Sequence, residues 1–289
     1  MISQNISSNP RPASCGAFLC FLHIKRHHEN VVAHFKITAN FARLRSGHFF
    51  AKKIIFYPIN VDKSRKKCYN IKLKYYAMSK GEKVTVHNLY SGSWLSNCYV
   101  LISRDSAGVS HAAVVDPSAD ANKIIDFLKA SGASLDMIIL THGHFDHIMS
   151  LDSLRALTGA EAYIHASDAE MLSDGYKNAY SFFFSEDFGQ KKAEKTISDG
   201  EILTLGDEKL KVIHLPGHTQ GSIGLLGDGF LITGDTLFDG GIGRTDLYGG
   251  NSMQLYASIG KLRELDENLT IYPGHGTSAA LRHALDGIF

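Results

Sequence analysis

The strongest constraint on what this chain can fold into is a cluster of metal-binding residue types, the segment THGHFDH at 141–147. Its histidines and aspartate directly follow an apolar run at 137–140 that predicts a buried strand. Imidazole and carboxylate groups are ligands for zinc and similar divalent ions, and they cost free energy when buried without partners. Gly143 permits backbone angles that would let His142 and His144 converge. A solvated histidine-rich turn is the alternative, but the pattern favours a metal site that includes Asp146 and His147.

Three later segments repeat the same arrangement, with a polar residue on a glycine-supported turn after an apolar strand. They contain His218 in LPGHTQGS, Asp235 in TGDTLF and His275 in YPGHG. Each of these residues, taken alone, is more typical of an ordinary turn. Because all four segments follow the carboxyl end of a strand, they would gather five histidines and two carboxylates on one edge of the sheets.

The chain after residue 83 alternates between strand and helix patterns. Strands are expected at 84–89, 98–103, 112–115, 135–140, 160–165, 201–205, 210–214, 223–226, 230–232 and 269–272, and helices at 120–130, 151–157, 167–172, 252–265 and 277–285. The segment 175–195 is expected to be a loop or flap, with its aromatic run at 180–184 anchored in the core rather than lining an acyl pocket. Helices between clustered hairpins predict two mixed sheets packed face to face, with helices on the outside.

Charge is unevenly distributed, although the formal net charge is only +1. Residues 1–77 contain 14 lysines and arginines but only two acids, whereas residues 78–289 contain 16 basic and 27 acidic residues. We therefore expect a basic N-terminal extension at 1–77 and a single folded domain at 78–289. A disordered leader or a mis-set start is the favoured interpretation of the extension, because Met78 begins an ordinary start followed by a strand. An organellar transit peptide and a nucleic-acid-binding arm are the alternatives.

Cysteine usage and hydropathy bear on the compartment. Three of the four cysteines lie within 1–77, so Cys98 cannot form a disulfide within 78–289, which fits a reducing compartment. No apolar run approaches the roughly 18–20 residues of a membrane span, and no export signal is recognised. The expected location is cytoplasmic, or organellar if the extension is a transit peptide. No membrane partner is expected.

The four motifs, in this order, resemble the metallo-β-lactamase superfamily over about residues 83–288. The resemblance implies an α/β (α+β) fold, the αββα four-layer sandwich. It also implies that His142, His144 and His218 hold one divalent metal ion. Asp146, His147 and His275 would hold a second, and Asp235 would bridge the two. Zinc is the expected metal, and iron and manganese are alternatives that the same ligand types accept.

The segment TGDTLFDGGIGRTD at 233–246 is similar to the glyoxalase II branch of that superfamily, the hydroxyacylglutathione hydrolases. The similarity implies hydrolysis of an activated acyl bond, in particular a thioester of the S-lactoylglutathione type. Two metal ions that share a water would supply hydroxide at neutral pH, and Asp146 would orient it or pass on its proton. Arg244 is the candidate contact for an anionic part of the substrate, although pairing with Asp246 is the favoured interpretation of its side chain.

Other functions remain open at this point. Only 14 residues follow His275, so the helical domain with which full-length glyoxalase II binds glutathione is not expected, and glutathione recognition is in question. A mono-iron persulfide dioxygenase and a lactonase are alternatives on the same fold. A non-enzymatic alternative is a silent fold that the basic extension tethers to nucleic acid or to a partner. The complete set of ligand types argues against it, so a small-molecule acyl substrate is the expected partner and nucleic acid is not.

Overall fold

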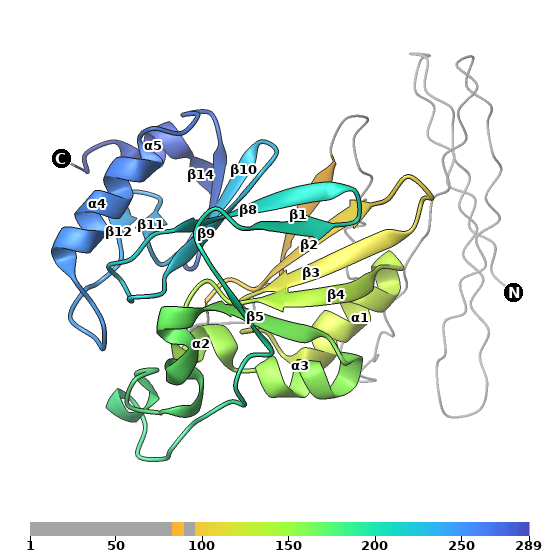
Figure 1. Ribbon diagram of the computed structural model, residues 1–289, viewed down its shortest axis with the longest axis horizontal. Helices are drawn as coiled ribbons and strands as arrows, with labels where there is room; N and C mark the ends of the chain where they lie inside the picture. Colours follow the sequence, from red (N-terminus) through yellow and green to blue (C-terminus); the bar gives the residue numbers. More distant parts are fainter. Residues whose placement is uncertain (1–82, 90–95, 289) are drawn as a thin grey trace, which may run out of the picture. The chain divides into compact units, whose positions relative to one another are not determined.

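The strands form two six-stranded sheets in the computed structural model, which describes residues 83–89 and 96–288 (Figure 1). The first sheet contains, in chain order, β1 (Val84–Asn88), β2 (Tyr99–Arg104), β3 (Ser110–Val115), β4 (Ser134–Ile139), β5 (Glu161–His165) and β6 (Lys195–Ile197). The second has the order β14–β13–β10–β9–β8–β7 and contains β7 (Ile202–Leu205), β8 (Glu208–His214), β9 (Ile223–Gly227), β10 (Phe230–Gly234), β13 (Thr270–Pro273) and β14 (Ala279–Ala280). A separate two-stranded ribbon consists of β11 (Leu237–Phe238) and β12 (Gly241–Ile242). Both large sheets are mixed, since β3 to β6 run parallel, as do β10 and β13, while β1, β2 and β3 pair antiparallel.

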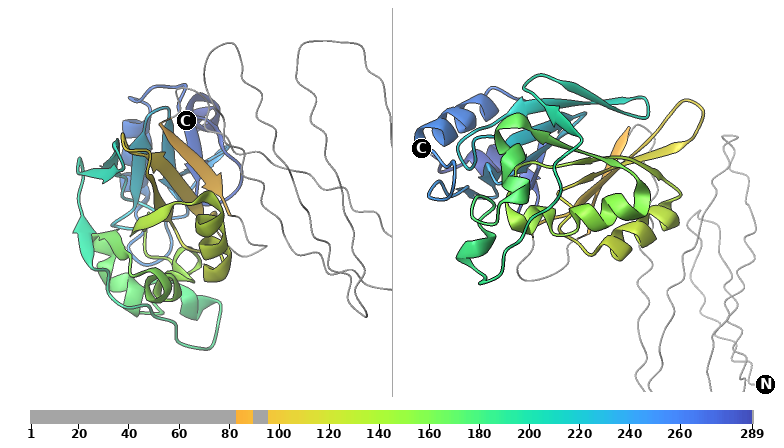
Figure 2. Two further views of the ribbon diagram at one scale, coloured as in Figure 1. Left: turned by 90° about the vertical axis from the view of Figure 1, so that its right-hand side faces the viewer. Right: turned by 60° about the horizontal axis from the view of Figure 1, so that its bottom comes forward.

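Strands that are buried on both faces divide their side chains between separate cores. In β2, Val100 and Ile102 lie in a core with the helices α1 (Ala121–Ser131) and α3 (Leu151–Thr158), whereas Tyr99 and Leu101 lie in a core with the second sheet. A third core joins the second sheet to α4 (Ser252–Leu262) and α5 (Leu281–Leu285). Figure 2 shows the helices on the two outer faces and the sheets between them. Three cores between four layers confirm the predicted αββα sandwich.

Local signals explain where the helices begin and end. The Asp120 side chain accepts hydrogen bonds from the backbone N–H groups of Asn122 and Lys123 and so caps the N-terminus of α1. The same helix ends at Gly132, which adopts the left-handed conformation with φ 69° that glycine tolerates best. The short helix α2 (Phe145–Ile148) begins inside the histidine-rich segment and places Asp146 and His147 on its first turn.

Three sequence-based expectations need correction. The segment 277–285 is not one helix, because Ala279 and Ala280 pair with β13 and the helix α5 begins only at Leu281. The segment at 167–172 is a 3₁₀-helix, η1 (Ala166–Ser173), rather than an α-helix. The loop at 175–195 contains a second 3₁₀-helix, η2 (Tyr180–Phe182), and its last residue already belongs to β6. Its aromatic run is not core, because Phe182, Phe183 and Phe184 are 56%, 48% and 43% exposed.

The proposed extension at 1–77, its cysteines and the domain boundary at 77/78 lie outside the described residues and remain predictions. Within 83–89 and 96–288, no helix is long and apolar enough to span a membrane.

Candidate metal centre

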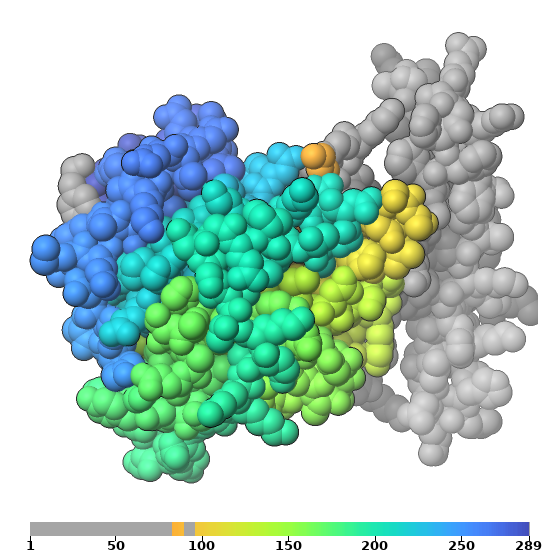
Figure 3. All heavy atoms as spheres, in the orientation of Figure 1, coloured from red at the N-terminus to blue at the C-terminus, as the bar shows by residue number. Residues whose placement is uncertain are grey.

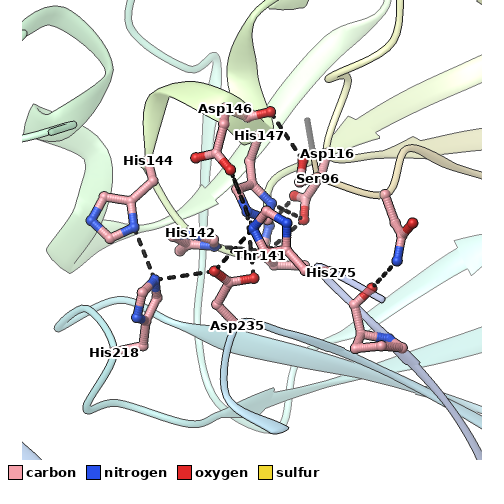
Figure 4. A network of polar contacts seen from close by, with 12 residues as sticks. Ser96, Asp116, Thr141, His142, His144, Asp146, His147, His218, Asp235 and His275 are labelled. Carbon is pink, nitrogen blue, oxygen red and sulfur yellow. Dashed lines mark hydrogen bonds and ion pairs between the residues drawn. The ribbon is translucent and has the colours of Figure 1, made fainter. Parts of the chain in front are cut away.

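The four motifs of the sequence converge at the carboxyl ends of four strands, as predicted (Figure 4). His142 follows β4 of the first sheet, whereas His218, Asp235 and His275 follow β8, β10 and β13 of the second. The centre therefore lies where the two sheets meet. All seven predicted residues are brought together there: His142, His144, Asp146, His147, His218, Asp235 and His275.

One group of three potential ligands consists of His142, His144 and His218, which are all buried and whose candidate ligand atoms lie within 4.8 Å of one another. His218 Nδ1 lies 2.7 Å from the carbonyl oxygen of Arg244 and donates to it, which leaves the lone pair on Nε2. That Nε2 is 2.9 Å from His144 Nδ1. Two ring nitrogens this close need a shared proton or a shared cation between them.

A second group consists of Asp146, His147 and His275, also with candidate ligand atoms within 4.8 Å of one another. Asp146 Oδ2 lies 3.2 Å from His275 Nε2 and 3.6 Å from His147 Nε2. Asp235 lies between the two groups, with Oδ1 3.4 Å from His147 Nε2 and Oδ2 3.5 Å from His218 Nε2. One carboxylate therefore faces both groups.

Several buried atoms of the cluster have no hydrogen-bond partner among the described residues. They are His142 Nε2, His144 Nε2, His147 Nε2 and Asp235 Oδ1. Unpaired buried polar atoms are costly and rare, so three histidines and a carboxylate in this state at one place indicate a ligand-binding site. Nitrogen and oxygen donors of this kind suit divalent zinc, iron or manganese. The residues present therefore fit a pair of metal ions, with one group of three for each ion and Asp235 between them.

The protonation states of the cluster agree with this assignment. Burial lowers the pKa of His142 well below its ordinary value and that of His144 to about 3, so both rings are neutral and carry a free lone pair. Burial also acts on His275, but the facing carboxylates of Asp146 and Asp235 outweigh it and raise its pKa to about 9. Facing carboxylates likewise outweigh burial at His147 and raise its pKa well above its ordinary value. Both rings would therefore carry protons at neutral pH without metal, and a metal ion would displace these protons, as is usual when metal binds ionisable ligands.

Asp116 contacts the ligand cluster from behind, although its sequence context indicated only the end of a strand. Its Oδ2 accepts from Thr141 Oγ1 at 2.6 Å and from His147 Nδ1 at 2.9 Å. Because the Thr141 hydroxyl donates to Asp116, its oxygen accepts from His142 Nδ1 at 3.0 Å. Asp116 thus fixes the tautomers of two rings so that both Nε2 lone pairs face the centre. Its backbone has φ 51°, an unusual conformation for a residue other than glycine, which is the kind of strain that functional sites hold.

The variant Asp116→Asn is expected to lower metal affinity about 10–100-fold, because its NH2 group would face either the Thr141 N–H that bonds to Oδ1 or the Thr141 and His147 donors that bond to Oδ2. Competition with a chromogenic chelator measures this affinity. Asp120→Asn, in the same loop but at the start of α1, is the matched control and should leave the affinity unchanged. An unchanged affinity in Asp116→Asn would contradict the role assigned to Asp116.

A second buried carboxylate, Asp168 of η1, connects the histidine loops of the two sheets. It accepts from Gly143 N at 3.1 Å, from Thr219 Oγ1 at 2.6 Å and from Gly221 N at 2.6 Å. The loop after β4 and the loop after β8 are therefore held against the same side chain.

Gly143 is required by close packing against η1 and not by a special backbone angle. A Cβ at this position would lie 2.6 Å from Met171 Cβ.

The centre opens into a pocket with a cavity of about 170 Å³, far more than one water molecule needs. The pocket is lined by His144, Phe145, Asp146, Ala179, Phe183, His218, Asp235, Arg244, Leu247 and His275. Arg244 forms the expected pair with Asp246, with Nε and Nη2 each 2.7 Å from a carboxylate oxygen. Contrary to the sequence-based expectation for the aromatic run, Phe183 belongs to the pocket.

Comparison with known proteins agrees with this architecture. The family model described as "Metallo-beta-lactamase superfamily" matches residues 92–275. The chain is 37% identical over 184 residues to the probable metallo-hydrolase YqgX of Bacillus subtilis, covering 63% of this chain and 85% of that protein. It is 33% identical over 176 residues to the hydroxyacylglutathione hydrolase GloC of Haemophilus influenzae, covering 58% and 81%.

A solved structure is similar as well. The crystal structure of the BLEG-1 B3 metallo-beta-lactamase superposes with a TM-score of 0.64 and 32% sequence identity, covering 70% of this chain and 97% of that one. The family model, the sandwich of two mixed sheets and the seven converging histidines and aspartates lead to one conclusion. This chain belongs to the metallo-beta-lactamase superfamily.

Proposed function

We propose that this protein is a metal-dependent hydrolase that cleaves thioesters of the S-lactoylglutathione type. The observation that carries the proposal is a seven-residue histidine and aspartate cluster that opens directly into a pocket. His142, His144 and His218 would hold one divalent ion, Asp146, His147 and His275 would hold the other, and Asp235 would bridge them. When bound, the two ions supply a water of lowered pKa and a Lewis acid for the carbonyl oxygen of the substrate. Zinc is the metal proposed, with iron and manganese as the other candidates.

The residues of the chain perform the remaining steps. Asp146 lines the pocket, and its Oδ2 faces the ring of His275, so this carboxylate orients the attacking water and holds the proton that leaves it. The carbonyl carbon of the thioester is attacked, its bond to sulfur breaks, and a carboxylate and a thiol are released. Phe145 and Ala179 exclude bulk water from one side of the reacting group.

The lining of the pocket favours a thioester over a substrate with a poorer leaving group. The lining histidines and Asp235 are assigned as metal ligands, so Asp146, which combines a ligand role with its place in the pocket, is the one described carboxylate proposed to exchange a proton with the substrate. A thiol has a pKa of about 8.5, so a thiolate can leave without a separate general acid. The similarity to a relative named hydroxyacylglutathione hydrolase supports the same substrate class. Cytoplasmic location and the absence of a nucleic-acid partner stay predictions.

Hydrolysis of S-lactoylglutathione by the purified, metal-loaded chain tests this proposal. A kcat/KM above about 10⁴ M⁻¹s⁻¹, within the usual range of enzymes, is the expected result. A lactone, a β-lactam and glutathione persulfide with measurement of oxygen uptake serve as competing substrates. Faster turnover of any of these three would replace the thioester proposal with a lactonase, a β-lactamase or a persulfide dioxygenase.

A further inference from the structure

The pocket at the metal centre has two chemically different sides. The ligand cluster forms its polar side, whereas Phe145, Ala179, Phe183 and Leu247 form an apolar side. Phe145 is 8% exposed and Phe183 is 48% exposed, and their ring centroids lie 5.7 Å apart. The apolar side therefore has a buried base and an accessible rim.

The base of this apolar side is held firmly beside the ligands. Phe145 lies between His144 and Asp146 in the sequence, and its backbone N–H donates to Asn178 O at 3.0 Å. Its ring packs edge-on against Tyr180 with centroids 5.4 Å apart. A substituent on a carbonyl group that reaches the ligand cluster would consequently contact the Phe145 ring.

Two positively charged side chains near the pocket are already paired with acids. Arg244 makes its two hydrogen bonds to Asp246, and Lys177 pairs with Glu170. Tyr248 Oη also donates to Glu170. This hydrogen bond joins η1 to the segment before α4, and these two segments meet on the face drawn in Figure 3. A negatively charged thiol part would have to compete with Asp246 for Arg244, so its charge contributes little to recognition.

We propose that the acyl group selects the substrate, and that the preferred acyl group is apolar and of aromatic size, packed against Phe145, Phe183 and Leu247. The thiol part is recognised only weakly. The inference rests on the thioester hydrolysis proposed above and specifies the substrate within that class.

The test compares S-mandeloylglutathione with S-lactoylglutathione, two α-hydroxyacyl thioesters that differ by a phenyl in place of a methyl group. The N-acetylcysteamine thioesters of both acids lack the charges of glutathione. The metal-loaded protein is expected to prefer the phenyl compound by about 10-fold or more in kcat/KM, with either thiol. Phe183→Ala and Leu247→Ala are expected to remove most of that preference, because each deletes apolar surface that only the phenyl group reaches.

Phe182→Ala is the matched control, since it removes the same side chain one position away at a residue that is 56% exposed and outside the pocket lining. It should keep the wild-type preference. A binding measurement independent of turnover uses S-benzylglutathione and S-methylglutathione, thioethers that cannot be hydrolysed. The S-benzyl compound should bind more tightly to the wild type, and Phe183→Ala should reduce this difference.

The outcomes separate the two proposals. Hydrolysis of both acyl groups at equal rates, or a phenyl preference that Phe183→Ala changes no more than Phe182→Ala does, overturns the acyl selection and leaves thioester hydrolysis standing. No hydrolysis of any thioester, together with tighter S-benzyl binding that is lost in Phe183→Ala, contradicts the proposed reaction and retains the apolar subsite.

Discussion

Replacing Asp235 by alanine is expected to remove metal from the centre and to lower kcat/KM at least about 1,000-fold, equivalent to about 4 kcal/mol of transition-state stabilisation. Asp235 is the residue that faces both groups of ligands, at 3.4 Å from His147 Nε2 and 3.5 Å from both His218 Nε2 and His275 Nε2. Its loss leaves the Nε2 atoms of His147 and His275 with only one of the two carboxylates that face them, Asp146. Elemental analysis of the purified variant and its rate with a thioester measure the two effects.

The matched control for this variant is Asp126→Ala, which removes an exposed carboxylate from α1 on the outer face of the first sheet. It should retain the wild-type metal content and rate. A variant Asp235→Ala that keeps two metal ions and more than a tenth of the activity would contradict the bridging role of Asp235.

The second large effect is expected on stability rather than on chemistry. Asp168→Ala should lower the free energy of unfolding by about 3–5 kcal/mol, because it leaves two buried backbone N–H groups without an acceptor and leaves the Thr219 hydroxyl with Ser222 Oγ as its remaining partner. The affected donors are Gly143 N, Gly221 N and Thr219 Oγ1, and Asp168 is fully buried. Urea denaturation followed by circular dichroism measures the loss.

Two comparisons make this result interpretable. Asp168→Asn keeps the volume and one acceptor oxygen, so its loss should be smaller than that of Asp168→Ala. Denaturation with and without a chelator separates the contribution of bound metal, which stabilises the folded state by mass action. A loss below 1 kcal/mol for Asp168→Ala under both conditions would show that the loops after β4 and β8 do not depend on this side chain.

Local patterns in the sequence were sufficient to predict the frame of this fold. Apolar runs located the central strands, and Asp120 with Gly132 marked the two ends of α1. The histidine and aspartate motifs were also predictable, because metal ligands require particular residue types and each motif followed a strand. The three motifs of the second sheet lie at one edge because β8, β10 and β13 run in the same direction.

The residues that position the ligands could not be predicted in the same way, because their partners are distant in the sequence. Asp116 bonds to Thr141, which is 25 positions away, and Asp168 bonds to Gly221, which is 53 positions away. Asp116 had the local signature of a strand end and Asp168 that of a helix, so neither sequence context indicated a buried acceptor. Similarly, Ala279 and Ala280 have a helical pattern, but pairing with β13 prevails over local propensity.

The prediction that the aromatic run at 180–184 is buried in the core was wrong for a related reason. A run of aromatic residues is most often buried in the core. At 180–184 nothing in the sequence distinguished burial in the core from exposure at the rim of a pocket. The structure places Phe145 in contact with Phe183, and both line the pocket. Arg244 combined two roles, since its side chain pairs with Asp246 while its carbonyl oxygen orients His218.

Metal titration of the stripped protein shows whether two ions held by these seven residues are required for hydrolysis. The protein is freed of metal with a chelator, and thioester hydrolysis is followed while zinc is added in equivalents. No activity is expected at the start, and the rate should rise and saturate at two equivalents per chain, with iron and manganese compared in parallel. Full activity of the metal-free protein would contradict this requirement.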